Sequence, residues 1–208
     1  MEDTTKTTIE TYDKTVDKFK ELTCKHQSLK DLSFFSSFLP EKAKVLDAGC
    51  GFGRDTKFFI DKRYETYGVD LSENMIKKAR EYAPGAEYSV QDLRKLDFSD
   101  SFFDGIWCAA TLHHLRREDL PSTIKRFNDL LKKGGLIFID VKEGSGEEFI
   151  ADLRYDSLKK YITYFSHAEI ESILKETNFE MIKSELRGSR SDQHKANLKW
   201  VTIFAKKL

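Results

Sequence analysis

The sequence has no excess of charge of either sign. Its 208 residues include 35 Lys+Arg and 35 Asp+Glu, so the formal net charge is zero although charged residues make up 34% of the chain. A protein that holds nucleic acid by neutralising phosphates usually carries a basic excess. We therefore expect no DNA partner, and an RNA partner only through a local basic patch.

Cysteines and long apolar runs are also scarce. Cys24, Cys50 and Cys108 are odd in number and widely spaced, with no C-x-x-C pair, so neither a disulfide framework nor a cysteine zinc site is expected. A reducing cytoplasm suits such a chain best. No run approaches eighteen apolar residues, and the N-terminus has no apolar signal region, so we predict neither export nor a membrane span.

The chain does have the material for one hydrophobic core. Its length corresponds to about one domain, and 39% hydrophobic and 12% aromatic residues argue against disorder. We predict a single domain over residues 1–208. It divides into N-terminal helices forming a lid (1–40), a ligand-binding core (41–142) and a C-terminal substrate-side segment (143–208).

The pattern of apolar residues predicts helices first and then alternating strands and helices. Apolar residues recur every three or four positions in residues 9–22 and 29–38, which is typical of two amphipathic helices. Later, β-branched and aromatic runs alternate with helical patterns, as in βαβ units around a mostly parallel sheet. The expected strands are residues 44–49, 65–70, 87–90, 103–110, 136–141, 179–186 and 198–205, and the expected helices are 54–62, 72–82, 120–132 and 166–177. Residues 142–164 have no clear pattern, and residues 187–199 predict a polar loop.

A glycine-rich turn joins the first expected strand of the sheet to the following helix. Residues 47–53 read DAGCGFG, and glycines at such a turn let a ligand lie against the backbone at a helix N-terminus. A dinucleotide fingerprint would need Gly or Ala at position 54, where the sequence has Arg54, and a P-loop would need Gly-Lys-Ser/Thr. The turn therefore favours a nucleoside ligand without a pyrophosphate.

Asp70 provides a second element of the same site. It ends the second expected strand about twenty residues beyond the glycine turn, where α/β nucleotide sites place the carboxylate that accepts hydrogen bonds from ribose hydroxyls.

Five motifs in order then resemble the class I S-adenosylmethionine-dependent methyltransferases. The motifs are residues 45–53 (VLDAGCGFG), 68–72 (GVDLS), 91–93 (QDL), 103–107 (FDGIW) and 131–136 (LKKGGL). The resemblance covers roughly residues 45–141. It implies a Rossmann-like, seven-strand, mostly parallel sheet with helices on both faces, in which the last strand runs antiparallel, and it implies S-adenosylmethionine as cofactor and S-adenosylhomocysteine as product.

The resemblance also implies roles for particular residues. Gly49, Gly51 and Gly53 would face the methionine part and the ribose, Asp70 would bind the ribose hydroxyls, and Leu71 and Leu93 would flank the adenine. Asp92 would accept from the adenine amine, Arg54 would pair with the cofactor carboxylate, Tyr12 would cover the cofactor, and Asp47 and Ala109 complete the expected cofactor-binding set. Two simpler alternatives stay open: that Asp92 only caps a turn, and that Tyr12 belongs to the core.

His113 and His114 follow the fourth expected strand at its carboxyl end, the side where open α/β sheets bind ligands. One of them is a candidate general base, and the alternative is that both only pack or cap. No third ligand stands at metal spacing, so no metal site is expected. Cys50 and Cys108 are interpreted as packing residues, whereas Lys142, His167 and Arg187 are candidate substrate contacts on connecting segments.

These observations predict a methyltransferase that acts on a small molecule by in-line displacement. One alternative is a tRNA-modifying enzyme, because residues 183–207 carry seven Lys+Arg against two acids and the segments around Tyr164 and Trp200 partly resemble tRNA-modifying relatives. Another is a non-catalytic cofactor-binding protein that kept the fold. A nicotinamide-dependent oxidoreductase is opposed by Arg54.

Overall fold

A seven-stranded sheet forms the centre of the computed structural model, which describes residues 3–188 and 198–208. The strand order is β3-β2-β1-β4-β5-β9-β8. All neighbouring pairs are parallel except those of β9, which runs antiparallel to both β5 and β8. The strands are β1 (Lys44–Ala48), β2 (Glu65–Asp70), β3 (Glu87–Val90), β4 (Phe103–Ala109), β5 (Leu131–Lys142), β8 (Phe179–Arg187) and β9 (Trp200–Lys207). The predicted fold class, including the antiparallel last strand, is confirmed.

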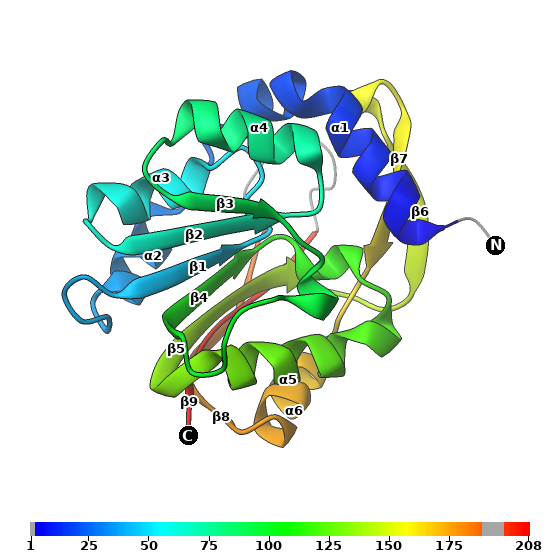
Figure 1. Ribbon diagram of the computed structural model, residues 1–208. Helices are drawn as coiled ribbons and strands as arrows, with labels where there is room; N and C mark the ends of the chain where they lie inside the picture. Colours follow the sequence, from blue (N-terminus) through cyan, green and yellow to red (C-terminus); the bar gives the residue numbers. More distant parts are fainter. Residues whose placement is uncertain (1–2, 189–197) are drawn as a thin grey trace.

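Helices cover both faces of this sheet (Figure 1). α2, α3 and α4 lie on one face and α5 and α6 on the other, while α1 crosses the end of the sheet where the parallel strands finish. The helices are α1 (Thr4–Thr23), α2 (Leu29–Ser36), α3 (Arg54–Asp61), α4 (Glu73–Tyr82), α5 (Leu120–Leu130) and α6 (His167–Glu176). Ser72 caps α4, and Ser166 with Glu169 forms the predicted capping box of α6.

Alternating strand residues divide the core between the two faces. Val45 packs with α2 and α3, whereas the next residue, Leu46, packs with the α5 and α6 side. The α2–α3 side is strongly aromatic, because the Trp107 and Phe138 rings stack with centroids 3.8 Å apart and planes 10° apart. Packing of this kind fixes the register of the central strands, on which the position of the site depends.

The boundary between α5 and β5 differs from the sequence prediction. The predicted helix 120–132 ends at Leu130, and β5 begins at Leu131 rather than at Leu136. The pairing register between β4 and β5 shifts over this stretch, where Gly134 has a φ of +77°. The two glycines therefore lie within the irregular start of the strand and do not precede it.

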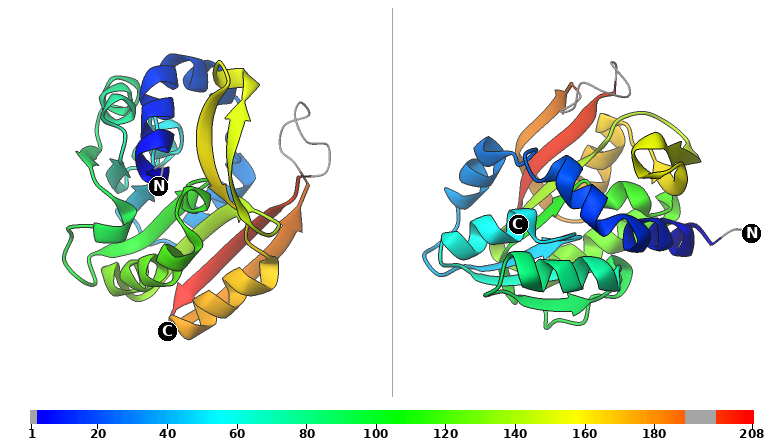
Figure 2. Two further views of the ribbon diagram at one scale, coloured as in Figure 1. Left: turned by 90° about the vertical axis from the view of Figure 1, so that its right-hand side faces the viewer. Right: turned by 90° about the horizontal axis from the view of Figure 1, so that it is seen from above.

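Residues 142–164, which had no clear pattern, form a hairpin of β6 (Glu147–Asp152) and β7 (Leu158–Thr163) outside the main sheet. The hairpin stands beside α1 (Figure 2). Thr8 Oγ1 accepts a hydrogen bond from the Tyr161 amide at 3.0 Å, and Thr11 Oγ1 donates to the Lys159 carbonyl at 2.6 Å. α1 and the hairpin thus form one cover over the end of the sheet.

Both N-terminal helices are present as predicted, and α1 has one irregularity. Thr15 has non-helical backbone angles (φ −123°, ψ 17°), which divides α1 into two segments. The predicted loop 187–199 falls largely outside the described residues. Within the two described ranges, no helix combines the length and apolar character needed to cross a bilayer.

The aromatic stack generates a stability prediction. Replacing Phe138 by Ala removes a fully buried ring, and we expect the free energy of unfolding in urea to fall by about 3–5 kcal/mol because the cavity refills only partly. Phe38→Ala, at a side chain that is 48% exposed, should change it by less than about 1 kcal/mol. Equal effects of the two substitutions would contradict the assigned core.

Candidate active site

A cavity of about 740 Å³ opens at the carboxyl ends of β1, β2 and β4, beneath α1 and the β6–β7 hairpin. The strand order reverses between β1 and β4, and open α/β sheets bind ligands at such a point. Twelve of the thirteen residues predicted from sequence to bind the cofactor or act in catalysis line it: Tyr12, Asp47, Gly49, Gly51, Arg54, Asp70, Leu71, Asp92, Leu93, Ala109, His113 and His114. Their proximity in one cavity supports a shared site, whereas the role of each remains a prediction.

The glycine turn makes the floor of the cavity. Gly49 has a φ of +80°, and a Cβ added there would lie 2.2 Å from Thr111 side-chain atoms, so position 49 requires glycine for its backbone angle and for space. Gly51, also at positive φ, lines the cavity. Gly53 does not: a Cβ there would meet Ala79 and Ala83 at 3.3 Å. Gly53 thus allows the turn to pack against α4, and its contact with the cofactor stays a prediction.

Asp70 is held at the end of β2 by backbone amides. Its Oδ2 accepts from the Gly51 amide at 3.0 Å and its Oδ1 from the Ser72 amide at 2.9 Å. Burial raises the pKa of the carboxyl, against the effect of these hydrogen bonds. A buried carboxylate that lines the cavity is suited to accept hydrogen bonds from a pair of hydroxyls, as the ribose of S-adenosylmethionine would offer. The acceptors that Asp70 presents to the cavity therefore fit the ribose of the cofactor.

Arg54 is bound within the protein. Its guanidinium pairs with Asp55 at 2.8 Å (Nε to Oδ1) and 3.0 Å (Nη2 to Oδ2). The same Asp55 accepts from the Trp107 indole at 3.1 Å and from Gln27 at 3.3 Å. Arg54 lines the cavity, but its bidentate partner is Asp55. An internal ion pair therefore already holds the guanidinium that the sequence predicted to bind the cofactor carboxylate.

Asp47 lies at the base of the cavity beside Thr56. Burial, followed by repulsion from Asp55, raises the pKa of the Asp47 carboxyl, and Thr56 Oγ1 donates to its Oδ2 at 2.6 Å. Burial therefore favours the protonated form of this carboxyl. The hydrogen bond from Thr56 joins the end of β1 to α3, because Thr56 is a residue of that helix.

Asp92 caps a turn, which is the simpler of the two roles that the sequence predicted for it. Its Oδ1 accepts from the Arg94 amide at 2.9 Å, and its carboxylate also pairs with the Arg94 guanidinium, which reaches Asp119 as well. Burial acts to raise the pKa of Asp92, but the Arg94 hydrogen bonds hold it below its usual value. Asp92 is thus a charged acceptor at the cavity wall, beside Leu93.

Tyr12 and His114 form a hydrogen-bonded pair across the cavity. The Tyr12 hydroxyl lies 2.9 Å from His114 Nε2, and His114 Nδ1 lies 2.9 Å from the Tyr161 carbonyl oxygen. A carbonyl only accepts, so Nδ1 carries the ring proton and Nε2 accepts from Tyr12. Burial lowers the pKa of His114 to about 3, with smaller contributions from nearby Lys160 and Lys142, so the ring is neutral. Tyr12 is therefore a lining residue with a specific partner.

His113 has a different environment. Its ring packs against His114 at 4.5 Å and against Trp200 at 5.6 Å between centroids. Its Nδ1 is buried and, within residues 3–188 and 198–208, has no hydrogen-bond partner. Burial holds its pKa well below the ordinary histidine value. The structure thus separates the two catalytic candidates: His114 is oriented by two partners, whereas the Nδ1 atom of His113 has no partner among the described residues.

The β6–β7 hairpin supplies cavity residues that the sequence analysis missed. Lys160 lines the wall, pairs with Asp152 at 3.1 Å and lies over the Tyr155 ring at 4.2 Å. Glu148 and Phe149 line the same side. Residues 147–152 (EEFIAD) and 158–163 (LKKYIT) do not alternate polar and apolar residues, so the only available signal was two short apolar stretches on either side of a polar turn.

The remaining sequence candidates divide between the cavity and the outer surface. Lys142 lines the cavity. His167 instead hydrogen-bonds Ser184, and Arg187 pairs with Asp31 and Glu185, so neither lines it. Cys50 and Cys108 are buried, and burial raises both thiol pKa values, which supports their assignment as packing residues. No group of three metal-ligating side chains occurs in the described part of the chain.

The neutral His114 generates a prediction about pH. The unfolded chain binds a proton on this histidine below about pH 6.5, whereas the folded chain does so only near pH 3, so stability is lost as the pH falls through this window. Between pH 7 and pH 5, we expect wild type to lose about 2 kcal/mol more free energy of unfolding than His114→Gln, measured in urea. Equal losses of free energy of unfolding in wild type and His114→Gln between pH 7 and pH 5 would contradict a neutral His114 ring.

Comparisons with known proteins agree with this geometry. A family profile described as a methyltransferase domain matches residues 45–135. Phosphoethanolamine N-methyltransferase 3 of Arabidopsis thaliana is 38% identical over 102 residues, which are 46% of this chain and 20% of that protein. Of the first three curated relatives, the chain spans only 20% to 44% of the length.

Solved structures show the same fold. A SAM-dependent methyltransferase of Methanosarcina mazei superimposes with a TM-score of 0.76 at 21% identity, covering 84% of this chain and 97% of that one. The 1,6-didemethyltoxoflavin-N1-methyltransferase of Burkholderia thailandensis, solved with S-adenosylhomocysteine, gives a TM-score of 0.68 at 24% identity, covering 86% and 77%. Residues 45–135 thus match a methyltransferase domain, and the chain shares its fold with S-adenosylmethionine-dependent methyltransferases of known structure.

Proposed function

We propose that the protein transfers a methyl group from S-adenosylmethionine to a small-molecule acceptor by in-line displacement. The observation that carries the proposal is one continuous cavity that holds both Asp70 beside the glycine turn and the Tyr12–His114 pair. Its volume of about 740 Å³ falls within the range of roughly 300–1,000 Å³ typical of small-molecule sites. The first group of residues would hold the cofactor, and the second would face the acceptor.

The cofactor, when bound, supplies a methyl group on a sulfonium whose departure leaves a neutral thioether, so no acid is needed for the leaving group. The protein has to align the acceptor with the methyl carbon and to exclude water. Asp70 would hold the ribose, and Leu71 and Leu93 would lie against the adenine. α1 and the hairpin cover the cavity and limit the access of water.

The Tyr12–His114 pair orients the acceptor in this proposal. Because Tyr12 donates its proton to His114 Nε2, its oxygen is left to accept a hydrogen bond from an N–H or O–H of the acceptor. Such a bond would direct the acceptor lone pair toward the methyl carbon. The low pKa of His114 makes it a positioning residue for Tyr12 rather than a strong base.

The names of relatives give a chemical class for the acceptor. Several curated relatives are phosphoethanolamine N-methyltransferases, and one is a 2-methyl-6-phytyl-1,4-hydroquinone methyltransferase. These names denote small acceptors, and the phosphoethanolamine enzymes act on a nitrogen. We propose a small acceptor for this chain too, and a cytoplasmic location in keeping with its three free thiols.

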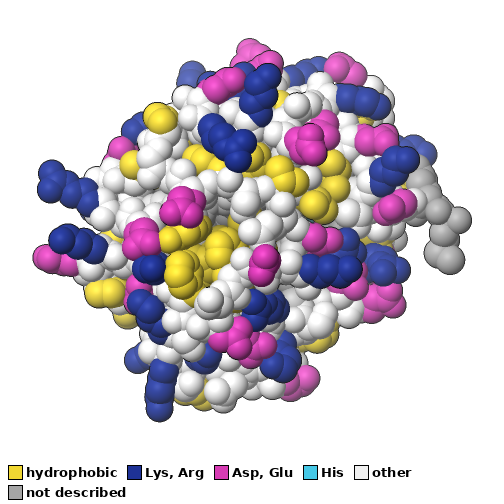
Figure 3. Space-filling model, in the orientation of Figure 1, with side chains coloured by type: hydrophobic (Ala, Val, Ile, Leu, Met, Phe, Trp, Pro, Cys, Tyr) yellow, Lys and Arg dark blue, Asp and Glu magenta, His cyan; other side chains and the backbone are white. Residues whose placement is uncertain are grey.

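A tRNA acceptor has weaker support. In the basic C-terminal region, Lys183 pairs with Glu185, Arg187 pairs with Asp31, and Lys207 donates to the Asn128 and Leu131 carbonyls. On the face shown in Figure 3, basic and acidic side chains are intermingled. Charges already paired within the protein add little to phosphate binding, so the small-molecule proposal is preferred.

Cofactor binding tests the first step. We expect S-adenosylhomocysteine to bind in isothermal titration calorimetry at micromolar concentrations, and Asp70→Ala to weaken it at least about tenfold, because hydrogen bonds to a charged group are lost. Asp61→Ala, on the exposed side of α3 where the residue pairs with Lys57, is the matched control. Absence of binding to wild type, or equal affinities of Asp70→Ala and wild type, would refute the proposed site.

Methyl transfer tests the second step. A cell extract incubated with the protein and methyl-labelled cofactor should yield a labelled small molecule rather than labelled tRNA. With that acceptor, Tyr12→Phe should lower kcat about tenfold to a hundredfold through misorientation, with little change in S-adenosylhomocysteine affinity. Labelled tRNA would replace the small-molecule proposal, and cofactor binding with no labelled product would favour a non-catalytic protein.

A further inference from the structure

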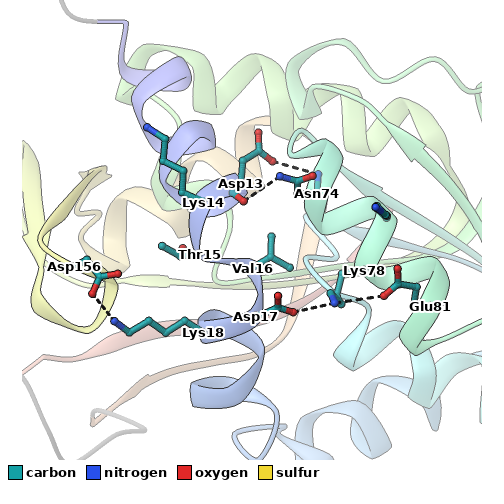
Figure 4. A pocket seen from close by; sticks show the side chains of 11 residues that line it. Asp13, Lys14, Thr15, Val16, Asp17, Lys18, Asn74, Lys78, Glu81 and Asp156 are labelled. Atoms are coloured by element: carbon teal, nitrogen blue, oxygen red, sulfur yellow. Dashed lines mark hydrogen bonds and ion pairs between the residues drawn. The ribbon is translucent and has the colours of Figure 1, made fainter.

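Asp13 joins the cover of the cavity to the start of α4. Its Oδ1 accepts from the Ser72 hydroxyl and, at 3.2 Å, from the Asn74 amide, while the Asn74 side chain donates to the Asp13 carbonyl at 3.0 Å. Figure 4 shows Asp13 on α1 facing Asn74 on α4. A carboxylate at this position also faces the positive end of the α4 dipole. One side chain of α1 thus satisfies several groups at the α4 N-terminus.

The hydrogen bonds continue from this contact into the cofactor region. Ser72 is buried, and its hydroxyl donates to Asp13 while accepting from the Met75 amide at 3.0 Å. The Ser72 backbone amide donates to Asp70 Oδ1, and Asp70 Oδ2 accepts from Gly51. An unbroken series therefore runs from α1 through Ser72 to the carboxylate expected to hold the ribose, and on to the glycine turn.

The same turn of α1 also carries the acceptor side of the site. Tyr12, next to Asp13, reaches into the cavity to His114, and the helix becomes irregular at Thr15, two residues after Asp13. The segment before Thr15 therefore holds Tyr12 in the cavity and Asp13 on α4 together. Movement of this segment would displace both residues at once.

We propose that Asp13 is a positioning residue that couples cofactor binding to closure of α1 over the cavity. This inference rests on the proposed function, since it takes the ligand at Asp70 to be the cofactor. Closure of α1 places Ser72, and Ser72 orients Asp70 for the ribose. Coupling between two sites is reciprocal, so a bound ribose stabilises the closed position of α1 by the same factor.

A second contact between the two helices provides the control. Asp17, one turn further along α1, pairs with Lys78 of α4 at 2.9 Å, and its side chain is 85% exposed (Figure 4). This pair also joins α1 to α4, but it does not contact Ser72 or Asp70. An exposed ion pair of this type contributes little to stability. The Asp17→Ala variant therefore measures what a contact between α1 and α4 contributes to cofactor binding without a hydrogen bond to Ser72.

The test compares Asp13→Ala, Asp13→Asn and Asp17→Ala with wild type. Calorimetry with S-adenosylhomocysteine should show a loss of about tenfold or more for Asp13→Ala. Asp13→Asn keeps an oxygen that accepts from Ser72 and Asn74, so it and Asp17→Ala should remain within about threefold of wild type. Thermal unfolding of each variant without ligand identifies any variant that fails to fold, and if Asp13→Ala does so, Ser72→Ala, which removes the same hydrogen bond from the α4 side, takes its place with the same expected loss.

Hydrogen exchange separates coupling from a structural effect. In wild type, S-adenosylhomocysteine should increase amide protection in residues 4–23 of α1, and Asp13→Ala at saturating ligand should lose most of this increase while Asp17→Ala keeps it. Equal affinities and equal ligand-induced protection in Asp13→Ala and wild type would overturn the inference. Because wild type would still bind and Asp70→Ala would not, that result leaves the proposed function standing, whereas no binding to wild type refutes the function itself.

Discussion

The site depends on the reversal of strand order between β1 and β4. From β1 the chain passes to β2 on one side, and β4 pairs with β1 on the other, so the connections leave the sheet edge in opposite directions and open a crevice between them. The glycine turn follows β1, Asp70 ends β2, and the two histidines follow β4. Three segments distant in sequence meet because parallel strands all end at one edge.

Within this crevice, several ionisable groups are held uncharged. Burial lowers the pKa of both His113 and His114, and it raises the pKa of Asp47, so it favours the uncharged form of each group. The charges that do remain near the cavity, such as Arg54 and Asp92, have partners within the protein. A wall with few unmatched charges suits a reaction in which a cationic methyl donor loses its charge, since the surroundings need little rearrangement as that charge moves.

The order and type of the central elements were predictable because β4, β5 and β9 carry runs of apolar residues and glycines mark the turn after β1. The glycine turn and Asp70 were predictable in place from these strand ends. Gly53 shows the limit of spacing as evidence: spacing marks a glycine, but whether it faces a ligand or a helix is decided by tertiary packing, here against Ala79 and Ala83. Likewise, the sequence indicated that Arg54 follows the turn, but it could not show that Asp55 would bind it.

The β6–β7 hairpin could not be predicted from the sequence for another reason. Its strands pair only with each other and lean on α1, so they do not have the long apolar runs of buried sheet strands. The sequence pattern therefore did not mark Lys160 and Asp152 as buried, and their burial follows from the cover formed with α1. One wall of the cavity thus comes from the part of the chain whose pattern is weakest.

The position of β9 has a consequence for how this protein is made. β9 lies between β5 and β8 and pairs with both, yet it is synthesised after them. Until β9 has joined the sheet, β8 has no neighbouring strand and one edge of β5 keeps its backbone groups unpaired, and unpaired edges invite association with other chains. Docking of β9 therefore completes the sheet and at the same time removes an edge at which other chains would pair.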